Sequence, residues 1–286
     1  MTNLHISTGM KRPLTYLLIV VLTVVCLALA AVVLPPGIDW RLTYRPSALA
    51  LLAGRSPYSA DVAPAAPFFA APWCLIPLLP LALLPEAVGR SILVLVTMAA
   101  FAYSAWRMGA RLPVLIAFLL SPPVVHCVRN SNIEWMPVLG FVLPPQWGLF
   151  LVVIKPQVGV AVVVFWLVEA WRRGKFREVI RVFGPVSLAF AISFALFGFW
   201  PSRLSASLGL AQTFNTSLWP ASIPVGLALL VTSIKTRKIN YAMAASPCLS
   251  PYVLLHAWAG ALVSIATLNA EMIVVVISMW TLVIRW

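Results

Sequence analysis

Residues 37–58, GIDWRLTYRPSALALLAGRSPY, follow an apolar stretch of about 16–34 and place one carboxylate and three arginines just beyond it. A helix that crosses a bilayer needs roughly 20 apolar residues, so 14–34 predicts a transmembrane helix. Pro35 and Pro36 follow it instead of a small-residue cleavage site, which favours a retained helix over a signal peptide. Pro46 suits the first turn of a helix and Gly54 suits its C-terminal cap. The two residues therefore predict a short helix between them that lies at the membrane interface.

The composition of the chain indicates a membrane protein. Of its 286 residues, 62% are hydrophobic and only 9% are charged, whereas about a quarter of the residues of a soluble domain are charged. Folding in water around one buried core would leave too little polar surface. The sequence therefore predicts an all-α polytopic membrane protein, with 1–286 forming a single integral membrane domain.

Apolar runs separated by short polar breaks predict about eight to ten transmembrane helices. The polar breaks are short apart from two longer loops, 35–70 and 201–219. Prolines at 144–145 and at 247 and 251 predict broken helices, either kinked or forming a re-entrant hairpin. The expected segments are 14–34, 71–86, 91–106, 112–127, 135–154, 156–171, 183–200, 220–234, 240–256 and 258–284.

The formal charge of +13 does not indicate nucleic-acid binding, because the basic residues lie in short clusters between apolar runs. By the positive-inside rule these clusters belong in the cytoplasm, so both long loops are expected on the extracytoplasmic side of the cell membrane. Tryptophans near segment ends, Trp40, Trp135 and Trp200 among them, are expected to form an aromatic belt at the interface. The two densest clusters are Arg172, Arg173, Lys175, Arg177 and Arg181, and Lys235, Arg237 and Lys238.

No cofactor or metal is expected from the motifs of the chain. The four cysteines are scattered, and no CxxC, Cys/His cluster, phosphate-binding glycine loop or DxD motif is present. The seven carboxylates offer few candidate bases. Glu169 and Glu178 are expected to balance the first basic cluster, and Asp61 and Glu86 to be solvated in loops. Glu271 is either a functional acid within the membrane or the mark of a loop. Asp39 and Glu134 then remain as candidates for a base at the membrane surface.

An ordered set of segments resembles glycosyltransferase family 87, a family of GT-C-type enzymes that use polyprenyl-phosphate sugars. In the loop, DWRLTYRPSALALLAGRSPY matches the family pattern of an Asp, a Tyr, a small-residue helix and Gly-x-x-Pro-Tyr at Asp39, Tyr44, Gly54, Pro57 and Tyr58. Three further segments follow in order: APWCLIPLLPLALLP, SPPVVHCVRNSNIEW and VVIKPQVGVAVVVFWLVEAWRRGK. The resemblance covers about 36–180. The family often has Gly-Gln where this chain reads Asn130-Ser131-Asn132.

The resemblance implies a GT-C-like bundle and an inverting transfer of a mannose-like hexose or a pentose to a lipid or glycan acceptor. Asp39 would act as general base on the acceptor hydroxyl, and cations would stabilise the lipid-phosphate leaving group. The expected partners are the polyprenyl-phosphate donor, the acceptor and membrane lipids; the oligomeric state is not predicted. The residues expected to bind phosphate or sugar are Arg41, Tyr44, Arg45, Tyr58, Arg129, Asn132, Glu134, Lys155 and His256.

Residue chemistry alone leaves simpler alternatives open. Asp39 could pair with Arg41 or Arg45, Lys155 could anchor a helix end, and Glu134 could be a helix N-terminal charge. Two other functions remain: a non-catalytic membrane subunit or scaffold with the same fold, and a transporter of small solutes or lipids. A transporter should show polar residues deep in several spans and often inverted repeats, whereas the polar residues here gather near one surface.

Overall fold

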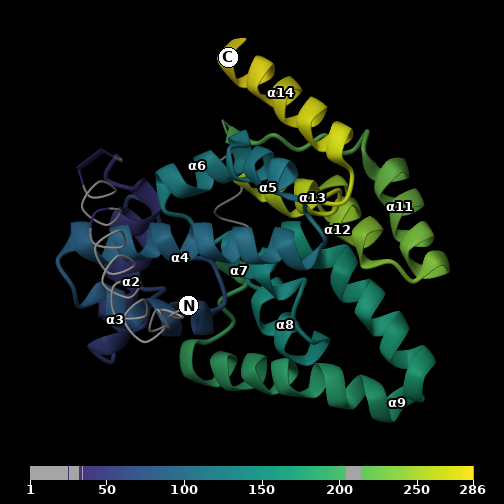
Figure 1. Ribbon diagram of the computed structural model, residues 1–286. Coiled ribbons are helices and arrows are strands. Elements are labelled where there is room, and N and C mark those ends of the chain that lie inside the picture. Colours follow the sequence, from purple (N-terminus) through teal and green to yellow (C-terminus); the bar gives the residue numbers. More distant parts are fainter. Residues whose placement is uncertain (1–24, 26–31, 34, 204–213, 286) are drawn as a thin grey trace, which may run out of the picture.

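The computed structural model describes residues 25, 32–33, 35–203 and 214–285, and these residues form helices without a strand (Figure 1). The predicted all-α class is therefore confirmed for this part of the chain. Most of the expected first transmembrane helix, 14–34, lies outside the described residues, as does 204–213 of the second long loop.

The loop after the first apolar stretch folds as two consecutive helical pieces. A π-helical turn, η2 (Trp40–Tyr44), leads directly into α2 (Arg45–Leu52), with Pro46 in the first turn of α2. Gly54 follows the end of α2 with φ +70°, and the Arg55 amide donates to the Ala50 carbonyl at 2.9 Å. This closure satisfies a helix carbonyl that would otherwise lack a partner, and it confirms the helix predicted between Pro46 and Gly54.

The remaining helices follow in short pieces with two long exceptions. In chain order they are η3 (Pro72–Leu78), α3 (Leu79–Ala82), α4 (Glu86–Arg107), α5 (Leu112–Leu119), α6 (Pro122–Asn130), α7 (Trp135–Gly140), α8 (Pro145–Val152), α9 (Pro156–Phe197), α11 (Ile223–Thr236), α12 (Ile239–Cys248), η5 (Leu255–Trp258), α13 (Ala259–Val263) and α14 (Asn269–Arg285).

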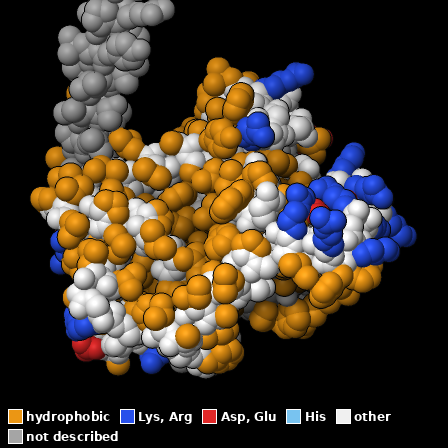
Figure 2. All heavy atoms as spheres, turned by 90° about the horizontal axis from the view of Figure 1, so that it is seen from below, with side chains coloured by type: hydrophobic (Ala, Val, Ile, Leu, Met, Phe, Trp, Pro, Cys, Tyr) orange, Lys and Arg blue, Asp and Glu red, His pale blue; other side chains and the backbone are white. Residues whose placement is uncertain are grey.

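Two of the described helices, α4 and α9, are long and apolar enough to cross a membrane. The pair α5 and α6 makes a third when counted as one span bent by 51°. The expected segment 71–86 is a short helical stretch, Pro72–Ala82, that ends before α4. The expected segment 258–284 is divided between α13 and α14. Large hydrophobic side chains are exposed over much of one face of the molecule (Figure 2), which is the kind of surface that lipid covers.

The broken segments predicted from proline are confirmed. Pro144 precedes α8, and α7 and α8 pack against each other as two half-helices. Gly140 and Gly148 lie at their contact, where a methyl group on either would collide with the backbone of the other. This arrangement favours the hairpin over the single kinked span. The second break follows Pro247, where α12 ends at Cys248 and 249–254 is not helical.

Two sequence-based expectations about this architecture are met only in part. The polar stretch 171–181 separates two helical arms of α9, as the expected segments 156–171 and 183–200 require, but the break is a kink at Gly174 and Lys175 and not a loop. The tryptophans expected at the interface are divided, because Trp147 and Trp219 are exposed while others are not. Trp40, Trp135 and Trp200 are buried within the protein, because their neighbouring helices pack over them.

Candidate functional site

Asp39 is brought beside the end of α6 by two residues with left-handed backbone. Gly37 has φ +63°, and a β-carbon there would lie 2.5 Å from the hydroxyl oxygen of Ser131. Ser131 itself has φ 54° and ends α6. A glycine at 37 is therefore required for the close approach, and the turn at Ser131 directs Asn132 toward Asp39.

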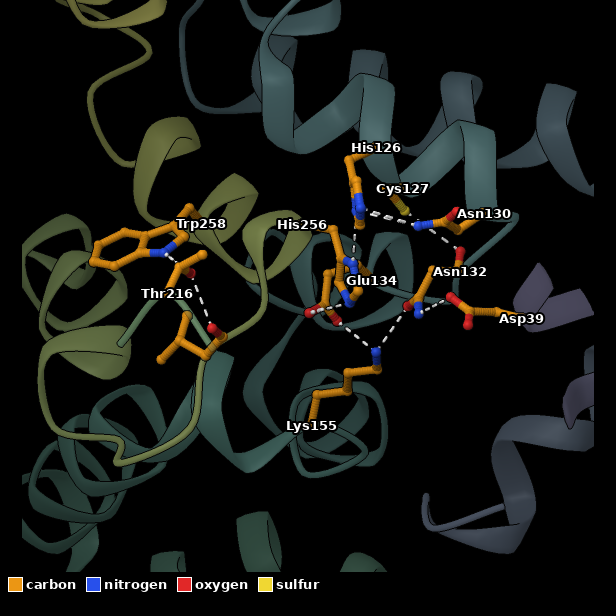
Figure 3. Close-up of polar contacts among 11 residues, drawn as sticks. Asp39, His126, Cys127, Asn130, Asn132, Glu134, Lys155, Thr216, His256 and Trp258 are labelled. Atoms are coloured by element: carbon orange, nitrogen blue, oxygen red, sulfur yellow. Dashed lines mark hydrogen bonds and ion pairs between the residues drawn. The ribbon is translucent and has the colours of Figure 1, made fainter. Parts of the chain in front are cut away.

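Asn132 is the direct partner of the Asp39 carboxylate. Its amide nitrogen donates to Asp39 Oδ2 at 2.6 Å, and its amide oxygen accepts from Lys155 Nζ at 2.7 Å (Figure 3). The ammonium group can only donate and the carboxylate can only accept, so these two partners fix the orientation of the amide. The backbone amide of Asn132 donates to the Cys127 carbonyl at 3.0 Å, which ties this residue to α6.

Lys155 also forms an ion pair inside the protein. Its Nζ lies 3.2 Å from Oε2 of Glu134, and the Glu134 side chain is fully buried. Glu134 immediately precedes α7, and Lys155 immediately precedes α9. Burial raises the pKa of Glu134, and the Lys155 charge opposes that rise. A buried carboxylate needs such a compensating cation, so Glu134 fixes the position of Lys155.

Two histidines continue this cluster on the side away from Asp39. His256 Nε2 lies 3.8 Å from Glu134 Oε1, and the Nδ1 atoms of His256 and His126 are 3.2 Å apart. The two rings are stacked, with centroids 5.4 Å apart. Asn130 approaches His126 through its side-chain amide nitrogen at 3.2 Å. The polar cluster thus runs from the partly exposed Asp39 through the buried Glu134 and His256 to His126, which is also partly exposed (Figure 3).

The environment of Asp39 suits a proton acceptor. Removal from water raises the pKa of Asp39, while the Asn132 hydrogen bond and the Lys155 and His126 charges lower it. The balance of these effects leaves the pKa above its ordinary value, so the carboxylate is a stronger base than one in water. Its partial exposure leaves it accessible to a bound hydroxyl group.

Several of the residues predicted for the site lie together, and three of them contact one another directly. Asn132, Glu134 and Lys155 are joined by the contacts described above, and His256 adjoins Glu134. Arg129 is exposed in the last turn of α6, three residues after His126. Residues spaced in this way share a face of a helix, so Arg129 is the exposed cation beside this cluster.

Arg41 and Arg45, which were also expected to bind phosphate or sugar, contact other groups of the protein. Arg41 lies 3.7 Å from the Glu86 carboxylate, and Arg45 donates to the Leu84 carbonyl at 3.5 Å. Within the described residues Asp39 therefore has no arginine partner, and the simple ion pair considered from the sequence is wrong. Burial, and secondarily the nearby Asp39 carboxylate, raises the pKa of Tyr44, which places Tyr44 close to the site.

Tyr58 lies in an aromatic cluster. Its hydroxyl donates to the Ala70 carbonyl at 2.7 Å, and its ring stacks on Trp200 with centroids 5.8 Å apart. Phe68 contacts the same ring at 5.3 Å. These contacts hold the loop 53–70 against the segment after α9, so the described role of Tyr58 is structural support of the loop.

Sequence reasoning missed His126, Asn130 and the pair formed by Gly37 and Ser131. His126 and Asn130 are four residues apart in α6, a spacing that predicts neighbouring side chains once the helix is assigned. The stretch Asn130-Ser131-Asn132 also carries a turn signal, because asparagine and serine end helices readily. The stacking of His126 on His256 had no comparable signal, since 130 residues separate them.

In the described part of the chain, no group of three or more His, Cys, Asp or Glu side chains is arranged to hold a metal ion. Comparison with known proteins gives no match to a protein family, to a curated protein or to a solved structure. The function is therefore inferred from the chemical arrangement of the site together with the motifs of the sequence.

Proposed function

We propose that the protein is an inverting glycosyltransferase that moves a mannose-like hexose or a pentose from a polyprenyl-phosphate donor to a lipid or glycan acceptor. The observation that carries the proposal is the Asp39 carboxylate, partly exposed and held by Asn132 and Lys155 at the end of a buried polar cluster. The resemblance of 36–180 to glycosyltransferase family 87 supplies the reaction class.

In the proposed reaction Asp39 accepts the proton of the acceptor hydroxyl. The acceptor oxygen forms a bond to the anomeric carbon of the sugar, and the bond from that carbon to the phosphate oxygen breaks. The electron pair of the broken bond leaves with the polyprenyl phosphate, and the configuration at the carbon inverts. General-base assistance of this kind contributes about 10²- to 10⁴-fold to a rate.

The leaving phosphate needs a cation, and Lys155 is already engaged by Asn132 and Glu134. We therefore assign the phosphate contact to Arg129, which is exposed and makes no ion pair or hydrogen bond with the rest of the described chain. Lys155 then acts by orienting Asn132. A guanidinium group is well suited to a phosphate because it donates two parallel hydrogen bonds.

The proposed setting is a GT-C-like bundle of about eight to ten transmembrane helices in the cell membrane, with Asp39 on the extracytoplasmic side. The apolar helices α4 and α9 support a membrane location. The clustering of basic residues supports the orientation, because Asp39 lies near the start of α9, beside Asn132 and Lys155, and the basic residues begin about one membrane thickness along the helix.

The test uses purified full-length protein reconstituted in liposomes with polyprenyl-phosphate-linked hexoses and pentoses and with a membrane lipid extract as acceptor. A product carrying one added sugar, detected by mass spectrometry, supports the proposal. Absence of transfer with every donor contradicts it and favours the second candidate, a non-catalytic membrane subunit. Lys155 is held by Glu134 inside the protein and is not free to bind a phosphate, and this observation favours the non-catalytic candidate.

A further inference from the structure

A second polar region lies at the far end of the first arm of α9. The arm runs from Pro156 to Arg173, where Gly174 and Lys175 turn the helix. A cavity of about 250 Å³ opens there, between α9 and the start of α12. Its lining combines apolar side chains with two carboxylates and with the cationic side chains of Arg173 and Arg237. The apolar lining residues are Pro145, Phe165, Trp166, Ala170, Val182 and Ile239.

The charges around this cavity are strongly unbalanced. Two carboxylates, Glu169 and Glu178, line it, while the two basic clusters contribute eight cations. Arg172 is held by Glu169 at 3.0 Å, and Arg181 is paired with Glu178. Six cations therefore remain in excess. Figure 2 shows Lys and Arg side chains gathered at one corner of an otherwise largely hydrophobic face.

Arg173 and Arg237 are the two cations placed to meet a ligand in the cavity. Arg173 is exposed and makes no ion pair within the described residues. Arg237 lies 4.0 Å from Glu169, and its side chain is 68% exposed. Both guanidinium groups are consequently free to donate to an anion, with only weak competition from Glu169.

The position of the cavity along α9 fits a membrane surface. Lys155 and Arg173 are eighteen residues apart, which corresponds to about 27 Å along a helix. This length is close to the roughly 30 Å thickness of the hydrocarbon core. When the arm spans the membrane, the basic corner therefore lies at the face opposite Asp39. Leu167 lies one helical turn before the lining residue Ala170, and its exposed side chain and that of Trp171 offer apolar contact to a lipid.

We propose that this cavity binds the headgroup phosphate of an anionic phospholipid, with Arg173 and Arg237 as its ligands and with the acyl chains lying along Leu167 and Trp171. The combination of a cationic rim with apolar walls and flanks fits a lipid better than a free phosphate, which would need no apolar surface. The inference does not depend on glycosyl transfer, because it concerns the opposite end of α9.

The experiment measures lipid binding by the full-length purified protein with native mass spectrometry. The protein is titrated with phosphatidylglycerol and, separately, with phosphatidylcholine of the same acyl chains. The cavity variant carries Arg173→Gln and Arg237→Asn, the latter because asparagine tolerates the left-handed backbone at 237. The matched control carries Arg107→Gln and Arg111→Gln, two exposed arginines that do not line the cavity. A third variant, Glu169→Gln, removes the competing carboxylate.

We expect the cavity variant to bind phosphatidylglycerol about tenfold more weakly, since two cations near the lipid phosphate are lost. The control should bind as the wild type does, and Glu169→Gln should bind more tightly, an opposite change that damage to the fold does not produce. Phosphatidylcholine carries the same phosphate beside a choline cation that the arginines repel, so the wild type should bind it more weakly than phosphatidylglycerol. Equal losses in the cavity and control variants, weaker binding by Glu169→Gln, or displacement of the lipid by millimolar inorganic phosphate would each overturn the proposal.

Discussion

The side-chain amide of Asn132 donates to the Asp39 carboxylate at 2.6 Å while accepting from Lys155 at 2.7 Å. One uncharged residue thus separates the carboxylate from the ammonium group. A direct ion pair would hold Asp39 as a weakly basic carboxylate, because an adjacent cation lowers a carboxyl pKa. The amide orients Asp39 while leaving its pKa above the ordinary value of 3.8.

Replacement of Asn132 tests this positioning role. Asn132→Ala removes the hydrogen bond that lowers the pKa of Asp39, so we expect that pKa to rise further and the rate of transfer to fall about 100-fold through misplacement of the base. The measurement is the pH profile of transfer by reconstituted protein. Asn240→Ala is the matched control, since Asn240 donates to the Ser264 carbonyl at 2.8 Å away from the site. An Asn132 variant with a lower rate but an unshifted pH profile would contradict the positioning role.

The wild-type pH profile follows from the same carboxyl group. The proposed base works only when ionised, so transfer should increase as pH rises through the pKa of Asp39 and fall on acidification. Burial raises that pKa, so the midpoint of the acidic limb should lie above 3.8 rather than below it. Initial rates across a pH series, with protein integrity monitored at each pH, give this midpoint. A midpoint below 3.8 would be inconsistent with the described environment.

The ion pair of Lys155 and Glu134 should stabilise the folded protein. Lys155→Met leaves the fully buried Glu134 carboxylate without its cation, and loss of one partner of a buried pair costs about 3–5 kcal/mol in the free energy of unfolding. The double variant Lys155→Met/Glu134→Leu removes both charges and should recover much of that loss. It should still be impaired in transfer, since Asn132 has lost its donor. Thermal unfolding in detergent compares the three proteins; a double variant less stable than the single one would refute the pairing.

Gly37 offers a test of how the site is assembled. Gly37→Ala places a methyl group 2.5 Å from the Ser131 hydroxyl oxygen in addition to straining a left-handed residue. Gly54→Ala is the matched control, because Gly54 has φ +70° but open space around it. We expect roughly 1–2 kcal/mol of destabilisation from backbone strain in both, with a further loss of stability and of transfer only at 37. Equal effects on transfer would show that the approach to Ser131 is unimportant.

The local features of this structure could be predicted from the sequence. Pro46 and Gly54 bounded α2 correctly, and the prolines at 144–145 and 247 located two breaks in apolar segments. These signals are local because proline removes a backbone donor and glycine permits left-handed backbone.

The features that were wrong or missed depend on tertiary contacts. The link from Asp39 to Asn132 spans 93 residues, and no periodicity predicts such a pairing. Lys155 was expected at a phosphate, and its buried position beside Glu134 could not be foreseen without the packing of α7 on α9.

The central claim is that Asp39 is the base in sugar transfer, and Asp39→Asn tests it most directly. The substitution keeps the size of the side chain and removes its ability to accept the proton. Asp61→Asn is the matched control, since Asp61 is a surface carboxylate paired with Arg55 at 3.1 Å. With both proteins reconstituted at equal amounts, transfer from polyprenyl-phosphate sugars should fall at least about 100-fold in Asp39→Asn and remain at the wild-type level in Asp61→Asn. Transfer by Asp39→Asn at the wild-type rate would contradict the account.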